Sequence, residues 1–352
     1  MPACTRIPSH LQPYVRLPRD DSILLLTSTL GASANWLIVR FLCDALSNHD
    51  EGGEPGHNVV LGSWMREYEF WKQEARKGGG LDLERLKKEG RFAFVDGLSG
   101  LCLDADTSTG AHAQSRRAGA PLKRNGLIEG PQSKRGALIE LPPRAAPGQI
   151  LPARGPPPAA APRTATTPKA STSPGHFALT SLDLAHLKAT VTDAVSSLSS
   201  SPSTSHRKTL LVLDNPDLLL ALDPSLTHSA LTSLMLTLRA LPTVSHILTH
   251  IQADTPLLSL STPPQLLELA HHNFLVKLGH MSRRILGVRV LDTGVARDVS
   301  GVVRVTQQEL GWTDFAVSEG AGKESAQGTE YLYQVRGDGS VRVFERGAGG
   351  DG

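Results

Sequence analysis

The chain has 352 residues, of which 39% are hydrophobic, 20% charged and 5% aromatic, and its formal net charge is +2. This length suffices for one large α/β domain or for two small ones. Residues 107–175 hold ten Lys/Arg against two acids, which leaves a net −6 for the rest, so the pI does not indicate a nucleic-acid-binding protein that is basic throughout.

The three cysteines are widely spaced and form no C-x-x-C pair, so neither a zinc site nor a disulfide framework is indicated. Residues 1–21 lack the apolar centre of a secretory signal. No run approaches the roughly 18 apolar residues of a membrane span. We therefore expect a cytoplasmic or nuclear protein in a reducing compartment.

The first part of the chain alternates between strand and helix patterns after an irregular leader over 1–21. The predicted elements are a strand over 23–30, a helix beginning at Ser33 and ending near 48, a strand over 59–62, helical turns over 67–77 and 81–88, and a strand over 91–97. The first and last of these strands are almost wholly apolar, which is typical of parallel strands covered on both faces.

Residues 107–175 differ from the rest of the chain in kind. They hold 12 of the 24 prolines and no aromatic residue. Such a segment cannot bury enough apolar surface to offset its conformational entropy, so we expect a disordered insertion.

The second half resumes the alternation and then becomes rich in strands. The predicted elements are helices over 182–198, 228–241 and 262–269, a short apolar piece over 218–222, and strands over 209–214, 245–252, 274–278, 286–291, 302–305, 331–335 and 341–344. The last two strands are joined by Asp338-Gly339, which suits a tight hairpin turn. The whole predicts an α/β domain with a mostly parallel sheet flanked by helices and C-terminal antiparallel hairpins.

The chain is therefore predicted to consist of five segments. They are a leader (1–21), the first half of the domain (22–106), the disordered insertion (107–175), the second half (176–346) and a flexible tail (347–352).

The turn after the first strand is where an α/β nucleotide-binding protein would hold phosphate. A phosphate loop of the form G-x-x-x-x-G-K-[ST] needs glycines for close backbone approach, a lysine for charge and a hydroxyl for Mg²⁺. Here the turn has the single glycine Gly31, and the positions of the second glycine and the lysine hold Trp36 and Leu37. The framework of a phosphate site is present without its chemistry.

Other acids occupy positions where nucleotide hydrolases carry catalytic groups. Asp214 ends an apolar strand, as a Mg²⁺-holding carboxylate does, but Asp also favours turns and caps. Glu67 and Glu69 follow the second strand on an amphipathic stretch, where a solvated helix face is the favoured interpretation. Asp96 ends a strand and is expected to cap a turn. We predict no catalytic, cofactor-binding or metal site, with Asp214 at most a vestige.

The histidines do not form a predicted metal site. His246 and His250 share one strand face but stand about 13 Å apart, and the adjacent His271 and His272 point apart on a helix. No Ser/His/Asp motif with local sequence support appears.

A cluster of basic residues lies in the second half of the chain. Such a cluster can contact phosphates, although ordinary surface arginines are the simpler interpretation. The candidates for tRNA binding are Arg283, Arg284, Arg289, Arg297 and Arg304.

Several blocks resemble the Elongator complex protein 6 family in its fungal form. They are residues 70–76, 80–83, 89–98, 209–217 and 291–302, within a resemblance that covers roughly 20–105 and 177–345. The resemblance implies a RecA-like fold without working ATPase motifs. It also implies a heterohexameric ring with the paralogous Elongator complex proteins 4 and 5, which binds the catalytic Elongator core and tRNA and supports wobble-uridine modification.

Two other functions stay open at this point. One is a divergent ATPase that uses Asp214 with a lysine or arginine supplied from elsewhere. The other is a DNA-directed RecA-like recombination accessory protein. Trp64, Tyr68, Phe70 and Trp71 are candidates for burial by a ring neighbour, or equally for the domain's own core.

Overall fold

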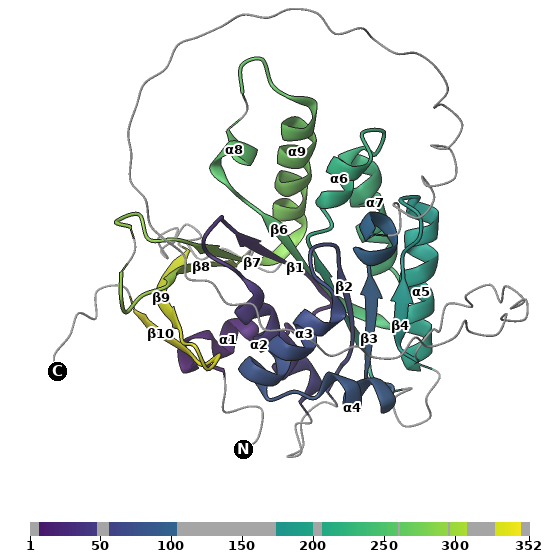
Figure 1. Ribbon diagram of the computed structural model, residues 1–352, viewed down its shortest axis with the longest axis horizontal. Coiled ribbons are helices and arrows are strands. Elements are labelled where there is room, and N and C mark those ends of the chain that lie inside the picture. Colours follow the sequence, from purple (N-terminus) through teal and green to yellow (C-terminus); the bar gives the residue numbers. More distant parts are fainter. Residues whose placement is uncertain are drawn as a thin grey trace, which may run out of the picture. The chain divides into compact units, whose positions relative to one another are not determined.

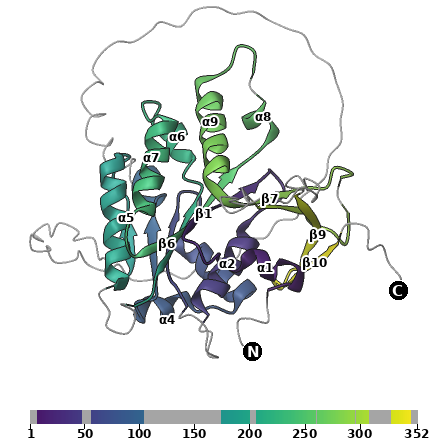
Figure 2. The same ribbon diagram turned by 180° about the vertical axis from the view of Figure 1, so that it is seen from behind.

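The computed structural model describes residues 7–47, 56–103, 174–199, 206–259, 261–294, 296–307 and 328–345. In these residues the chain forms a ten-stranded sheet with helices against both faces (Figures 1 and 2). The strands are β1 (Ser22–Ser28), β2 (Asn58–Ser63), β3 (Phe92–Asp96), β4 (His176–Ala178), β5 (Thr209–Asp214), β6 (Val244–Gln252), β7 (Ser282–Arg289), β8 (Gly301–Gln307), β9 (Thr329–Val335) and β10 (Val341–Glu345). The helices are α1 (Gln12–Val15), α2 (Asn35–Leu46), α3 (Tyr68–Glu74), α4 (Leu83–Lys88), α5 (Leu184–Ser199), α6 (Leu218–Leu222), α7 (His228–Arg239), α8 (Thr255–Leu258) and α9 (Leu266–Met281), with shorter turns η2 (Ser9–Leu11), η3 (Ala75–Gly79) and η4 (Ser99–Leu103).

The strand order is β10-β9-β8-β7-β1-β6-β5-β2-β3-β4. Every pair from β7 to β4 is parallel, and β7–β8, β8–β9 and β9–β10 are antiparallel. This confirms the predicted α/β fold class with a mostly parallel sheet and C-terminal antiparallel hairpins. The predicted disordered insertion over 107–175 and the tail over 347–352 lie outside the described residues, apart from Pro174 and Gly175.

Alternating side chains of the central strands feed two separate cores. In β1, Leu24 and Leu26 join the core under α2, α3 and α4, whereas Ile23 and Leu25 join the core under α5, α7 and α9. This alternation follows from the two-residue period of a strand. Since both faces are covered, β1, β2, β3 and β5 are buried almost throughout and have apolar centres, as is typical of parallel strands.

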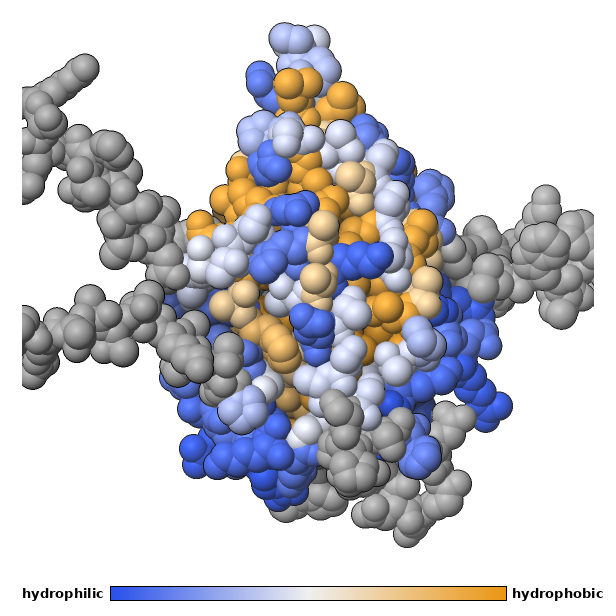
Figure 3. Space-filling model, turned by 90° about the vertical axis from the view of Figure 1, so that its right-hand side faces the viewer, coloured by the Kyte–Doolittle hydropathy of each residue, from blue (hydrophilic) through white to orange (hydrophobic). Residues whose placement is uncertain are grey.

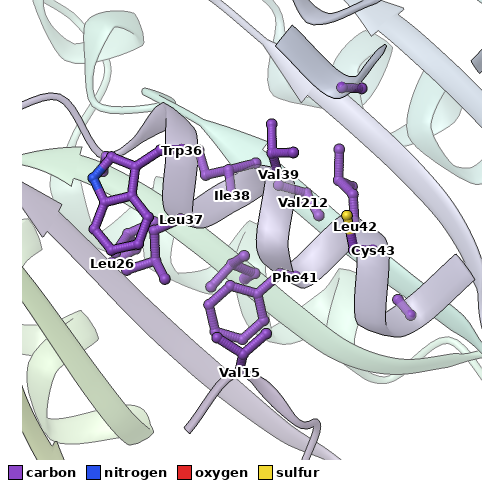
Figure 4. Close-up of a cluster of buried hydrophobic side chains, with 14 of the residues drawn as sticks. Val15, Leu26, Trp36, Leu37, Ile38, Val39, Phe41, Leu42, Cys43 and Val212 are labelled. Carbon is purple, nitrogen blue, oxygen red and sulfur yellow. The ribbon is translucent and has the colours of Figure 1, made fainter. Parts of the chain in front are cut away.

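Helix α2 is the most deeply embedded helix of the first layer. Ten of its 12 residues are buried, and Figure 4 shows Leu37, Phe41 and their neighbours packed against Leu26 and Val15. Full burial of a Leu or Phe side chain stabilises the fold by about 1.5–3 kcal/mol. Arg40 is also buried and donates through Nη2 to Gly339 O at 2.9 Å and through Nη1 to Gly78 O, so it joins α2 to η3 and to the β9–β10 turn.

One predicted strand is wrong. Residues 274–278 belong to α9, a 16-residue helix that begins with a capping box between Gln265 and Glu268. A short apolar run fits either a strand or a buried helix, and the cap together with packing of Phe274 and Leu278 in the second core decides for the helix. The predicted N-cap at Ser33 is displaced to Ala34, although Ser33 Oγ does accept from Asn35 N at 3.3 Å.

Residues 7–21 of the leader contain regular structure that the sequence did not predict. Ser9–Leu11 form a 3-10 turn and Gln12–Val15 a short helix with proline in its first turn, where the missing N–H costs nothing. Leu11 and Val15 are fully buried in the first core. Packing, rather than local propensity, orders this segment.

Candidate functional site

Four neighbouring strands end in polar side chains at one edge of the sheet. The register places Ser28 of β1 beside Gln252 of β6, His250 of β6 beside Asp214 of β5, and Asp214 beside Ser63 of β2. The carboxyl ends of parallel strands are where α/β proteins bind ligands. We call these residues the carboxyl-edge cluster.

Hydrogen bonds link the cluster into one buried chain. Ser28 Oγ lies 2.8 Å from His250 Nε2, His250 Nδ1 lies 2.8 Å from Asp214 Oδ1, and Ser63 Oγ donates to Asp214 Oδ2 at 2.7 Å. A carboxylate only accepts, so His250 Nδ1 carries the proton of that bond. Ser28, Ser63, Asp214 and His250 are each at most 3% exposed. With Nδ1 protonated, His250 Nε2 accepts the single hydroxyl proton of Ser28, whose Oγ also lies 3.2 Å from Gln252 Oε1.

Arg66 supplies the positive charge of the cluster. Its Nη1 lies 3.6 Å from Asp214 Oδ2, and its backbone N–H donates to Ser63 Oγ at 3.1 Å. With the Asn35 amide oriented by its hydrogen bonds, Asn35 Oδ1 accepts from Arg66 Nε at 3.2 Å and from Nη2 at 3.3 Å. The guanidinium also stacks on Phe70, with 5.1 Å between its central carbon and the ring centroid. Arg66 therefore joins the loop after β2 to the start of α2.

The turn after β1 is closed on itself. Ala32 N donates to Thr29 O at 2.9 Å, and Gly31 has φ +86°, which favours glycine. Leu30 N donates to the carboxylate of Asp254 at 2.6 Å, and Thr29 N donates to Val288 O at 3.2 Å. A phosphate loop offers its backbone N–H groups to phosphate oxygens, whereas these three already donate to acceptors within the protein.

The two positions that replace glycine and lysine of a phosphate loop point into the core. Leu37 is fully buried, and Trp36 is 7% exposed with its ring centroid 4.9 Å from that of Tyr333 (Figure 4). They extend the first core to β9 rather than facing the turn. Trp36 and Leu37 therefore act as packing residues.

Ser28, His250 and Asp214 stand in the order of a serine-hydrolase triad, which the sequence reasoning missed. The three residues come from three strands, so no local motif could reveal them; only the sheet register brings them together. A triad also needs backbone donors aimed at an oxyanion. Thr29 N and Leu30 N, which follow Ser28, donate to Val288 O and Asp254 instead. This arrangement favours a structural network.

A second buried polar group follows Asp214. Asn215 has φ +58°, a left-handed conformation that Asn tolerates better than most residues, and its N–H donates to His250 O at 2.9 Å. Its side chain lies 3.5 Å from Asp217 Oδ1, and Asp217 Oδ2 lies 3.2 Å from His271 Nε2. This group connects the end of β5 to α9.

The other acids take the simpler roles. Glu67 and Glu69 are exposed, and Glu69 pairs with Lys72 at 3.0 Å, as on a solvated helix face. Asp96 is 6% exposed and accepts from the backbone N–H groups of Leu98 and Ser99, both at 2.9 Å. Asp96 therefore caps its turn.

His246 and His250 have separate hydrogen-bond partners, and the ring centroid of His246 lies 5.8 Å from that of His57. His246 is 2% exposed at the amino end of β6, with Nε2 3.0 Å from Pro18 O and Nδ1 2.9 Å from Ser245 Oγ. Burial lowers the pKa of His246 to about 4. Among the described residues, no group of three or more His, Cys, Asp or Glu side chains could hold a metal ion.

The five arginines proposed from the sequence do not lie together. Arg284 is 8% exposed and its Nη1 donates to Tyr14 O and Arg16 O, so it holds the leader; burial lowers its pKa. Arg289 pairs with Asp292 and Glu330. Arg297 lies exposed in the β7–β8 loop, while Arg289 and Arg304 share one face of the sheet. Arg283 lies where the pairing of β7 with β1 shifts register, and its Nη1 is buried.

The aromatic residues after β2 pack mainly into the domain itself. Trp71 is fully buried, Trp64 is 2% exposed and Tyr68 is 8% exposed. Gly97 lets Trp64 lie close, because a Cβ at residue 97 would stand 2.7 Å from Trp64 Cδ1. Only Phe70 is half-buried.

Apolar groups also reach the surface. Figure 3 views the molecule from the side of α5 and shows apolar groups in the upper part of this face and mostly hydrophilic groups in its lower part.

Among the described residues, no helix combines the length and apolar content that crossing a bilayer would require.

Comparison with known protein families finds no match, and comparison with curated proteins finds none either. The solved structures that match include the KaiC-like protein PH0186 from Pyrococcus horikoshii OT3, with 11% identity, a TM-score of 0.47, and coverage of 96% of both chains. A likeness of this level carries no weight for the function of this chain, which is inferred below from its own residues.

Proposed function

We propose that this chain is a non-catalytic RecA-like subunit of the Elongator complex. In this proposal it assembles with Elongator complex proteins 4 and 5 into a heterohexameric ring, and the ring binds tRNA and supports modification of the wobble uridine. It has no cofactor and acts through shape and assembly.

The main observation behind the proposal is that side chains of the protein already provide the charges that Mg²⁺ and phosphate would provide in a hydrolase. The guanidinium of Arg66 lies beside Asp214, where a hydrolase would hold Mg²⁺, and the Asp254 carboxylate accepts from the turn as a phosphate oxygen would. The lysine position holds the buried Leu37. Because Arg66 already balances the charge of Asp214, binding of Mg²⁺ and a nucleotide there would add little electrostatic stabilisation.

The partners come from the family resemblance. Its blocks fall on structured parts of the chain: residues 89–98 cover β3 and its flanks, and residues 209–217 cover β5 and the turn after it. These blocks support membership of a ring-forming RecA-like group without implying catalysis.

The deciding experiment is co-purification of the tagged full chain, followed by identification of its partners and native mass determination. We expect recovery of the two paralogous subunits in a six-subunit assembly. Recovery of the chain as a lone monomer, with neither paralogue present, would remove the basis of the proposal.

The divergent ATPase remains the second candidate because Arg66 places a cation 3.6 Å from Asp214 Oδ2. It predicts that the purified chain hydrolyses ATP, and that Asp214→Ala abolishes this activity in protein that remains folded. Our proposal predicts no hydrolysis above a no-protein control.

A further inference from the structure

The antiparallel strands β8, β9 and β10 present two unlike faces. One face supplies Val303, Val305, Tyr331, Tyr333, Val341 and Val343 to the first core. The register and the alternation of a strand place the intervening residues on the opposite face. That face continues from the side of β7 that carries Arg289.

The opposite face is rich in arginine. Arg304 of β8 lies opposite Gly287 of β7 and Glu330 of β9, and Arg342 of β10 lies opposite Gln334 of β9. Together with Arg289 this gives three arginines against one glutamate, Glu330. We call these residues, with Leu332 and Phe344, the arginine face.

The arginines of this face differ in whether an acidic side chain pairs with them. Arg289 pairs with Asp292 at 2.5 Å and with Glu330 at 3.4 Å. Arg304 and Arg342 are exposed, and neither forms an ion pair with any residue that the structure describes. The excess positive charge therefore faces solvent at these two positions.

Two half-buried apolar side chains lie between these charges. Leu332 is opposite Val302 on one side and Phe344 on the other, so an aliphatic and an aromatic group stand side by side on the same face. An aromatic side chain beside exposed arginines on a sheet is the arrangement that stacks unpaired bases while contacting their phosphates.

We propose that the arginine face binds an unpaired stretch of a polynucleotide. Arg304 and Arg342 lie two strands apart and four positions along, about 16 Å, so they can contact separate phosphates. Phe344 would stack on a base between them. The charge complementarity favours a polyanion, and the aromatic group favours bases over an acidic peptide. The identity of this strand as tRNA rests on the proposed function, whereas its recognition by these side chains does not.

The test measures binding of a fluorescein-labelled 12-nucleotide RNA to the full chain between 50 and 200 mM salt. Arg304→Gln with Arg342→Gln should weaken binding at least about tenfold at 50 mM, and should lower the log–log salt slope by about 1.4, or 0.7 for each lost phosphate contact. Phe344→Leu should cost about tenfold with the salt slope unchanged.

A matched control removes two exposed lysines from the other end of the sheet. Lys88→Gln with Lys188→Gln has the same charge change, and these residues lie on α4 and α5, which both contact β3. We expect it to bind RNA within about twofold of the parent chain. An equal loss in the control pair would show that only net charge matters, which would overturn the proposal.

Three other outcomes would also overturn it. They are no RNA binding by the parent chain at 50 mM salt, unchanged binding by the folded Arg304/Arg342 variant, and displacement of RNA by polyglutamate with no effect of Phe344→Leu. If the chain binds the 12-mer but its assembly does not bind tRNA, the proposed function fails and this inference stands. If tRNA binds the assembly and ignores both variants, the reverse holds.

Discussion

The carboxyl-edge cluster and the arginine face use charge in opposite ways. In the cluster, Asp214 is buried among a cation, an imidazole and a hydroxyl, each within 3.6 Å. On the arginine face, Arg304 and Arg342 stand in solvent without an ion pair to any described residue. A buried charge that loses its partner leaves the survivor desolvated, whereas a solvated charge can be removed at little cost. The first region should therefore govern stability, and the second should govern binding.

The largest expected effect comes from Asp214→Leu. It leaves Arg66, His250 and Ser63 without their shared acceptor, and we expect a loss of about 3–5 kcal/mol in the free energy of unfolding, measured by urea titration. Asp193→Leu, at an exposed position of α5, is the matched control and should change stability by no more than about 0.5 kcal/mol. Equal effects of the two substitutions would remove the distinction between the regions.

His246 extends the comparison to the amino end of β6, where a buried imidazole contacts Pro18 O, Ser245 Oγ and the ring of His57. Its pKa is lowered to about 4, so the unfolded chain binds more protons below pH 6.5 and stability falls as the pH drops from 6.5 towards 4. We expect this group to cost about 2.5 kcal/mol between pH 7.5 and 4.5. The measurement is the difference in that pH dependence between the parent chain and His246→Gln. Parallel curves would contradict the assignment.

Arg66→Met should have a smaller effect. The residue is about a quarter exposed, and it loses the ion pair to Asp214 and the bonds to Asn35, so we expect about 2 kcal/mol by urea titration. The control is Arg85→Met, whose surface pair with Glu89 contributes only about 0.5 kcal/mol. An Arg66 loss no greater than the Arg85 loss would mean that the turn and β2 are held by packing alone.

Arg304→Gln with Arg342→Gln should leave stability within about 0.5 kcal/mol of the parent chain. These side chains contact solvent, so their removal breaks no buried network. Thermal and urea unfolding both report this quantity. A loss of 2 kcal/mol or more would show that the arginine face belongs to the fold in the same sense as the cluster.

The smallest expected effect is the reaction of Ser28 with a fluorophosphonate probe. We expect no labelling, because Ser28 is 3% exposed and the two N–H groups after it already donate elsewhere. A serine hydrolase in the same assay is the positive control. Labelling that Ser28→Ala abolishes would turn the cluster from a structural network into a nucleophilic site.

The sequence predicted the sheet better than the cluster. The apolar strands around Leu24 and Leu211 and the Asp338-Gly339 hairpin turn carry their signal in adjacent residues. The link from Ser28 to His250 spans 222 positions, and that from His250 to Asp214 spans 36, so only the strand register reveals them. The sequence did not identify Arg66, because a cation that replaces the missing lysine can come from any neighbouring loop.

The candidate arginines show a similar limit. Arg283 and Arg284 are adjacent in sequence, yet Arg284 is buried and holds the leader, whereas Arg283 lies at the register shift between β1 and β7. A count of charges along the chain cannot separate them. The strand predicted over residues 274–278 is wrong for a related reason, because its apolar pattern fits a strand as well as the helix that packing favours.

The pairing of β3 with β4 has a consequence for how this chain can change length. The two strands are parallel neighbours, so residues 97–175 form a crossover, and such a connection needs about a dozen residues. Beyond that minimum, each doubling of its length costs only about 0.6 kcal/mol in closure entropy. Among the described residues β4 is the last strand on this side of the sheet, so growth there displaces no described strand. Residues can therefore be added or removed at this position at little cost in stability. A deletion that left only residues 97–106 would make the crossover too short, and we expect it to detach β4 from β3 while the rest of the sheet stays folded.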